Sequence, residues 1–238
     1  TLYGGTGNDT IYTATSKVPR QRGDVVYGGQ GTDTLVGSFN KDFLIGGEEE
    51  NNADVETDWI DYSNLVLGAN TYGISVNLEQ TTNFTDTGDR GYLDGNYSQV
   101  IRLDSNGNEI VSQFDYISQI ENITGSSGDD TFTGNTSQNS ILAGAGDDII
   151  YYTRGLDYYD GGNHTTSSGQ GSGTPSVGGG DWISLAKETT TTVNFDLYKS
   201  SVGANITNRS AKVTNIENII GYNGVQATTG WGTDSNNT

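Results

Sequence analysis

Apolar and polar residues repeat with a period of nine in two stretches of the chain. The first unit reads Gly4-Gly5-Thr6-Gly7-Asn8-Asp9-Thr10-Ile11-Tyr12, and residues 28–36 repeat the pattern. Numbered as places one to nine, the unit has glycine at places one, two and four, an acid at place six and a large apolar residue at place eight. Glycine permits the positive φ of a tight turn. The alternation over places six to nine predicts a short strand whose place-eight side chain faces inward.

The nine-residue frame continues through further units, with some glycines replaced. In the first stretch the units begin at residues 19, 28 and 37, and in the second at residues 125, 134, 143 and 152. Units that begin at residues 46 and 161 are interrupted and resume at Asp58 and Asp181. The place-eight residues that we expect to face inward are Ile11, Val26, Leu35, Leu44 and Ile60 in the first stretch and Phe132, Ile141, Ile150, Tyr159 and Ile183 in the second.

A turn followed by a strand, repeated in tandem, predicts an all-β fold built of parallel β-roll blocks and joined by further strands and a hairpin. Because two units of nine complete one turn of such a roll, acids 18 residues apart should stack, as Asp24 with Asp42 and Asp130 with Asp148. A shift of 115 residues superposes 19–46 on 134–161, so the module is repeated in tandem. The expected divisions are a first β-roll block (1–61), a linking β segment (62–124), a second block (125–184), a second linking segment (185–220) and the start of a degenerate repeat (221–238).

The linking segment contains a turn signal, Asn106-Gly107, between the apolar runs 100–103 and 109–111. This arrangement favours a β-hairpin. The alternative is an EF-hand loop that begins at Asp104 and has Asp115 as its twelfth residue. That alternative is disfavoured because Glu109 stands where such a loop requires glycine.

Composition and charge exclude several classes of function. The 238 residues include 30 acids and 11 bases, for a net charge of -19, so the chain lacks the basic surplus of a nucleic-acid-binding protein. It has no cysteine and no apolar run long enough to span a bilayer. Stacked aspartates among glycine turns repel one another unless a hard cation takes their oxygens, and Ca²⁺, with six to eight oxygen ligands, suits such a site better than Mg²⁺.

The glycine-aspartate frame and the sequences Ile120-Glu121-Asn122-Ile123 and Ile216-Glu217-Asn218-Ile219 resemble those of the repeats-in-toxin (RTX) family of secreted bacterial proteins, which carry hemolysin-type calcium-binding repeats. The resemblance implies calcium-loaded β-rolls, type I secretion, and folding on Ca²⁺ binding outside the cell. It carries the calcium ligands over to Asp9, Asp24, Asp33, Asp42, Asp58, Asp130, Asp148, Asp157 and Asp181. Asn139 would make a weaker site. Backbone ligands would come from Gly5, Gly7, Gly29, Gly31, Gly47, Gly128, Gly144, Gly146 and Gly162.

No catalytic constellation stands out in the sequence, so we expect a non-enzyme. The leading hypothesis is a calcium-binding structural segment of a secreted bacterial cell-surface protein, an S-layer protein or an adhesin. Its partners would be calcium ions and either other copies of itself or surface polysaccharide, and inserts of opposite charge around Arg20 and Glu49 would suit contacts between copies. The alternatives are a folding and secretion module of a secreted hydrolase (protease or lipase), or a carbohydrate-binding module that uses Trp59 and Trp182.

Overall fold

The computed structural model describes residues 1–13, 23–47, 56–67, 71–85, 95–153, 155–163, 181–185, 193–196, 201–204, 210–216 and 218–220. The regular structure in these ranges is entirely β, which confirms the predicted all-β class. The strands are β1 (Leu2–Thr6), β2 (Thr10–Tyr12), β3 (Val25–Gln30), β4 (Thr34–Val36), β5 (Phe43–Ile45), β6 (Trp59–Asp61), β7 (Thr71–Asn77), β8 (Thr82–Phe84), β9 (Gly95–Asp104), β10 (Glu109–Ser118), β11 (Asn122–Thr124), β12 (Thr131–Thr133), β13 (Ser140–Leu142), β14 (Ile149–Tyr151), β15 (Tyr158–Asp160), β16 (Trp182–Ser184), β17 (Val193–Asp196), β18 (Ser201–Ala204), β19 (Ser210–Thr214) and β20 (Asn218–Ile220). The part of the chain that the structure describes has no helix long and apolar enough to cross a membrane.

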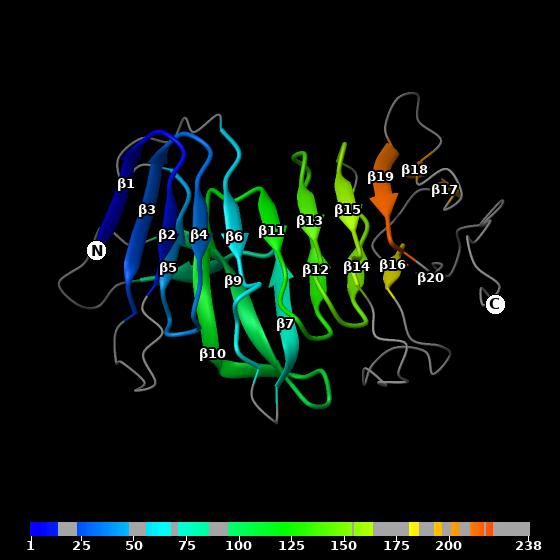
Figure 1. Ribbon diagram of the computed structural model, residues 1–238, viewed down its shortest axis with the longest axis horizontal. Coiled ribbons are helices and arrows are strands. Elements are labelled where there is room, and N and C mark those ends of the chain that lie inside the picture. Colours follow the sequence, from blue (N-terminus) through cyan, green and yellow to red (C-terminus); the bar gives the residue numbers. More distant parts are fainter. Residues whose placement is uncertain are drawn as a thin grey trace.

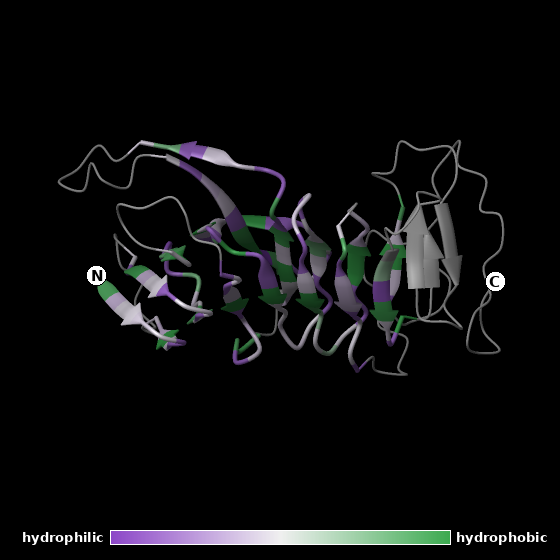
Figure 2. Ribbon diagram, turned by 90° about the horizontal axis from the view of Figure 1, so that it is seen from above, coloured by the Kyte–Doolittle hydropathy of each residue, from purple (hydrophilic) through white to green (hydrophobic). Residues whose placement is uncertain are grey.

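The strands form two sheets, and both extend along the long axis of the molecule (Figures 1 and 2). Sheet A has the order β1-β3-β5-β10-β9-β7-β12-β14-β16-β20, with β8 attached to β9, and sheet B has the order β17-β18-β19-β15-β13-β11-β6-β4-β2. Within the repeat stretches the chain alternates between the sheets, and strands from successive turns pair in parallel. Ile123 of β11, for example, lies between Ile60 of β6 and Ile141 of β13.

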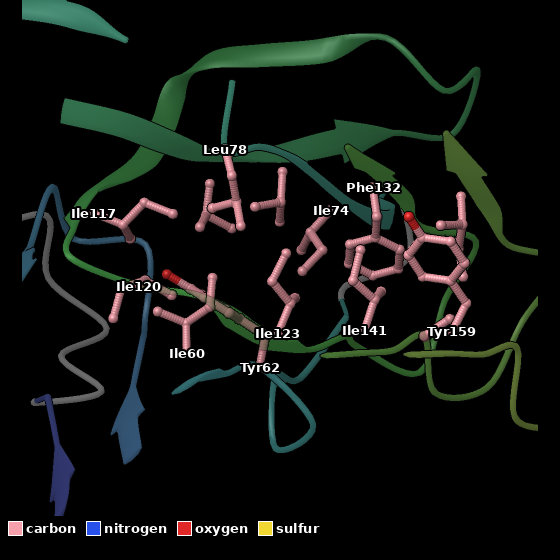
Figure 3. Packing of buried hydrophobic residues seen from close by; sticks show 14 of the residues in the cluster. Ile60, Tyr62, Ile74, Leu78, Ile117, Ile120, Ile123, Phe132, Ile141 and Tyr159 are labelled. Carbon is pink, nitrogen blue, oxygen red and sulfur yellow. The ribbon is translucent and has the colours of Figure 1, made fainter. Parts of the chain in front are cut away.

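The place-eight side chains fill the space between the two sheets, as predicted. Leu35, Leu44, Ile60 and Phe132 have no exposed surface, and Ile11 at the amino-terminal end is partly buried. Ile123, Ile141 and Tyr159 continue the same row of packed side chains (Figure 3). A single buried cluster therefore runs from the first repeat stretch into the second.

The segment 62–124 contributes strands to both sheets. In sheet A, β10, β9 and β7 form an antiparallel ribbon between β5 and β12. In sheet B, β11 pairs with β6 and with β13. Pairing is thus continuous across both expected boundaries of this segment. The division of the chain into domains remains a prediction, and its last piece, 221–238, lies outside the described residues.

The predicted hairpin is confirmed. Strands β9 and β10 pair in antiparallel fashion, and the turn between them is closed by Gly107, whose φ is 75° and whose N–H donates to the carbonyl of Asp104. The same ribbon buries aromatic side chains on the outer face of sheet A, where Phe43 contacts Phe84, Tyr97 and Tyr116 at ring-centroid distances of 4.6–5.2 Å. This second apolar cluster fixes the ribbon against the repeat strands.

Candidate metal centre

Each acid at place six is bonded in both directions to the turn beside it. The N–H of Asp33 donates to Oδ1 of Asp58 at 2.7 Å, while the carbonyl of Asp33 accepts the N–H of Trp59 at 2.8 Å. The same pair of bonds joins Asp148 to Asp181 and Trp182. One carboxylate oxygen of Asp33, Asp58, Asp148 and Asp181 is thereby used to hold the neighbouring turn.

These bonds link the place-six residues into four ladders. Each ladder follows a row of turns at one end of the strands. The pairs expected from the 18-residue spacing, Asp24 with Asp42 and Asp130 with Asp148, are direct neighbours. The ladders are Asp9–Asp33–Asp58–Glu121, Asp24–Asp42–Asp115, Asp130–Asp148–Asp181 and Asn139–Asp157.

Two members of the ladders, Asp115 and Glu121, were not expected from the repeats. Glu121 accepts the N–H of Asp58 at 3.0 Å and stands at place six of the frame that runs back from residue 125. Asp115 is fully buried and accepts the N–H groups of Phe39 and Asp42 and the hydroxyl of Tyr62. Each is followed by one residue and then isoleucine, which matches places six to eight of the repeat. This short acid-x-apolar match is the only feature of the sequence that could have identified them as ladder residues.

The second carboxylate oxygen has no hydrogen-bond partner in Asp9 and in Asp148. Each of these Oδ2 atoms is buried, and Asp148 has no exposed surface at all. A buried carboxylate oxygen with no donor is unfavourable unless a cation or a proton compensates its charge. Oxygen ligands from carboxylates and carbonyls are what Ca²⁺ requires. The residues present therefore fit a calcium ion in these turns, although the part of the chain that the structure describes contains no group of three acidic or histidine side chains around one point.

Burial raises the pKa of several ladder acids, among them Asp148, Asp130 and Asp115, above the usual range of a carboxyl. For Asp148 the rise is large, because burial is reinforced by the charges of Asp130 and Asp181. Burial is also the main cause that raises the pKa of Asp130 to about 8 and that of Asp115 to about 7, the latter with a contribution from Asp42. Without a bound cation, these three carboxyls hold their protons at a pH where ordinary carboxyls have lost them.

The glycines of the pattern make these turns possible. Gly29 and Gly31 have φ angles of 111° and 126°, in the left-handed region that other residues avoid. Gly28, at place one, approaches the carbonyl of Gly46 and Oδ2 of Asp33 so closely that a Cβ atom would collide with both. The glycines predicted as backbone ligands that adopt positive φ are Gly5, Gly7, Gly29, Gly31, Gly144, Gly146 and Gly162. Gly128 does not adopt a positive φ, and Gly47 is the last described residue before the insert at 48–55.

The remaining predicted residues lie as follows. Asp24, Asp42, Asp157 and Asn139 occupy ladder positions, while most of the turn before Asp24 and the inserts at 48–55 and 164–180 lie outside the described residues. Trp59 and Trp182, the basis of the carbohydrate-binding alternative, are half-buried at place seven of equivalent strands.

A protein-family model of the RTX calcium-binding nonapeptide repeat matches the chain in four copies, over residues 1–14, 21–51 and 124–159. These three segments hold most of the ladder residues. The segments are RTX calcium-binding nonapeptide repeats. The RTX repeats thus coincide with the turns whose carboxylates stack, and the antiparallel ribbon lies between the matched segments. No curated protein was found to match the chain significantly.

Proposed function

We propose that this chain is a calcium-binding structural segment of a secreted bacterial cell-surface protein, and that its RTX repeats wind as a parallel β-roll that folds on binding Ca²⁺ outside the cell. The observation that carries the proposal is the buried Oδ2 of Asp148, which has no hydrogen-bond partner in a turn of left-handed glycines. A calcium ion bound there would supply the missing positive charge.

Calcium would act on the fold through mass action. A ligand that binds the folded chain and not the unfolded one stabilises the fold in proportion to the logarithm of its concentration. Extracellular calcium modules bind at roughly 10⁻⁴–10⁻³ M. The chain would therefore remain unfolded in a calcium-poor cytosol and fold after export, as a type I secretion substrate must.

The structural role, rather than an enzymatic one, is supported by the position of the buried acids. They lie in the ladders, where their carboxylates accept backbone N–H groups of neighbouring turns and hold the turns together. Asp33 accepts the N–H of Asp9, and Asp148 accepts that of Asp130. A continuous core with two long sheets suits a rigid segment of an S-layer protein or an adhesin. The inserts that would contact other copies of the chain or polysaccharide lie outside the described residues.

Titration calorimetry tests the calcium part of the proposal. We expect Ca²⁺ to bind in the millimolar range or tighter and Mg²⁺ to bind much more weakly, because Mg²⁺ requires a smaller octahedron and retains its water. An absence of binding, or equal binding of the two ions, would contradict it. Antibody labelling of intact cells of the source organism tests the surface location, and label found only after cell lysis would contradict that part.

A further inference from the structure

The turns of the ladders fall into two kinds that differ at place two. The N–H of Gly29, at place two of its turn, donates to the carbonyl of Gly46 in the next turn at 2.9 Å. The N–H of Gly162, also at place two, donates to Oδ1 of Asp160 at 3.1 Å.

The N–H of Ser126, at place two, donates to Oδ2 of the acid in its own turn, Asp130, at 2.6 Å. The hydroxyl of Ser126 also donates to Oδ1 of Asp130 at 2.7 Å. The N–H of Ser38, at the same place, donates to Oδ2 of Asp115 at 3.3 Å.

Every described turn with a polar residue at place two is closed by its own side chains. Ser38 donates its hydroxyl to Oδ2 of Asp42 at 2.9 Å. The N–H of Asn135 donates to Oδ1 of Asn139 at 2.8 Å, and Nδ2 of Asn139 donates in turn to the carbonyl of Glu121. In these turns the oxygens that a cation would take already accept hydrogen bonds.

The Asp157 turn follows the same rule with threonine at place two. Oδ2 of Asp157 accepts the hydroxyl of Tyr159 at 2.7 Å and the N–H of Gly155 at 3.1 Å, while the Thr153 hydroxyl lies beside that of Tyr159 at 3.3 Å. Oδ1 accepts the N–H of Asn139 at 2.9 Å. Although Asp157 stands at place six of the frame, as Asp148 does, its two oxygens are both satisfied.

We infer that the residue at place two decides whether a turn takes calcium. Turns with glycine there bind the ion, and turns with serine, threonine or asparagine there are closed by hydrogen bonds and bind none. This inference rests on the proposed calcium function and, among the turns that the structure describes in full, narrows its sites to those of Asp9, Asp33 and Asp148.

In the first half of the molecule the two kinds of turn lie at opposite ends of the strands. The glycine turns lead from sheet A to sheet B, as between β1 and β2, and the Ser38 turn leads back from β4 to β5. In the second half the glycine turns lead from sheet B to sheet A, as between β13 and β14, and the Thr153 turn leads back, but the Ser126 turn between β11 and β12 lies on the same side as the glycine turns. The ladder of Asp130 and Asp148 would thus contain both a closed turn and a calcium-binding turn.

The number of calcium ions bound at saturation, measured by equilibrium dialysis, tests this inference. Asp148→Asn should lose at least one ion relative to the unaltered chain, whereas the matched change Asp157→Asn should lose none. Circular dichroism in calcium establishes that each variant is folded when the ions are counted. Equal losses in the two variants would overturn the inference.

A second variant tests the rule by gain of a site. Ser126→Gly restores glycine at place two of a turn that already has Gly125 and Gly128, so it should bind one ion more than the unaltered chain. Ser126→Ala, which removes the hydroxyl without supplying glycine, should add none. An unchanged count in Ser126→Gly would overturn the rule for place two, whereas an unaltered chain that binds no calcium would overturn the proposed function itself.

Discussion

The N–H of Asp130 donates to Oδ1 of Asp148 at 2.7 Å, and the carbonyl of Asp130 accepts the N–H of Ile149, one residue further, at 2.9 Å. The two aspartates are 18 residues apart, the length of two repeat units. A backbone N–H of the neighbouring turn thus holds Oδ1 of Asp148, whereas its buried Oδ2 has no hydrogen-bond partner. We expect this second oxygen to govern the response of the fold to calcium and to pH.

Truncation at place eight should be costly. Leu35 has no exposed surface and packs between the two sheets, so Leu35→Ala should lower the free energy of unfolding by about 2–5 kcal/mol through lost contacts and a residual cavity. Leu35→Asp should cost more, because it buries an unpaired charge. Thr34→Asp, at the outward-facing neighbour, should have a small effect. Denaturant melts in calcium measure all three, and an equal loss for Thr34→Asp would show that the assignment of faces is wrong.

Asp115 should stabilise the turn at residues 38–42 without calcium. Phe39 and Lys41 adopt positive φ angles of 61° and 60°, an uncommon conformation for such residues, and Asp115 accepts the N–H of Phe39 at 2.9 Å. Asp115→Ala leaves several buried donors without an acceptor and should destabilise by roughly 3 kcal/mol or more. Tyr62→Phe, which removes one donor from the same carboxylate, should cost about 1 kcal/mol. Chemical denaturation compares the two, and a smaller effect for Asp115→Ala would contradict its role.

The close approach at place one predicts that Gly28 tolerates no side chain. A Cβ atom there would lie against the carbonyl of Gly46 and the carboxylate of Asp33, so Gly28→Ala should strongly lower the melting temperature. Gly95→Ala is the matched control, since the nearest atom to its Cβ would be a ring carbon of Tyr97 at 3.6 Å. If both variants melt alike, the packing of neighbouring turns is looser than the structure indicates.

Calcium affinity should fall as the pH is lowered. Burial raises the pKa of Asp148 well above its ordinary value, so calcium must displace a proton to bind there. We expect the affinity to rise with pH and proton release to accompany binding. Calorimetry in buffers of different ionisation enthalpy measures both, and a pH-independent affinity with no proton release would contradict this.

The metal-free fold should show the opposite dependence on pH. Burial raises the pKa of Asp130 in the fold to about 8, so the folded state binds a proton that the unfolded state releases near pH 4. Its contribution to stability is present below about pH 4 and is lost as the pH rises to about 8. In chelator, more β structure should therefore be retained at pH 5 than at pH 8, as circular dichroism measures. More β structure at pH 8 would mean that Asp130 is ionised in the metal-free fold.

The sequence predicts the features of this molecule that depend on residues close together in the chain. The nine-residue period identifies the inward side chains, such as Leu35 and Ile150, and the 18-residue spacing identifies which acids are neighbours. It does not predict that Asp115 meets Asp42, because 73 residues separate them and an antiparallel ribbon brings them together. Nor does the pattern distinguish Asp148 from Asp157, because that difference depends on which donors surround the carboxylate. In the sequence alone, Ser126 and Thr153 are only departures from the glycine at place two. Their hydrogen bonds become known only from the structure.

Far-ultraviolet circular dichroism at pH 8, first in excess chelator and then in millimolar Ca²⁺, measures whether the fold depends on calcium. We expect the β spectrum to be lost in chelator, to return on addition of Ca²⁺, and not to return with the same concentration of Mg²⁺. A β spectrum that stays unchanged in chelator would contradict the claim that calcium bound in the ladders holds this fold together.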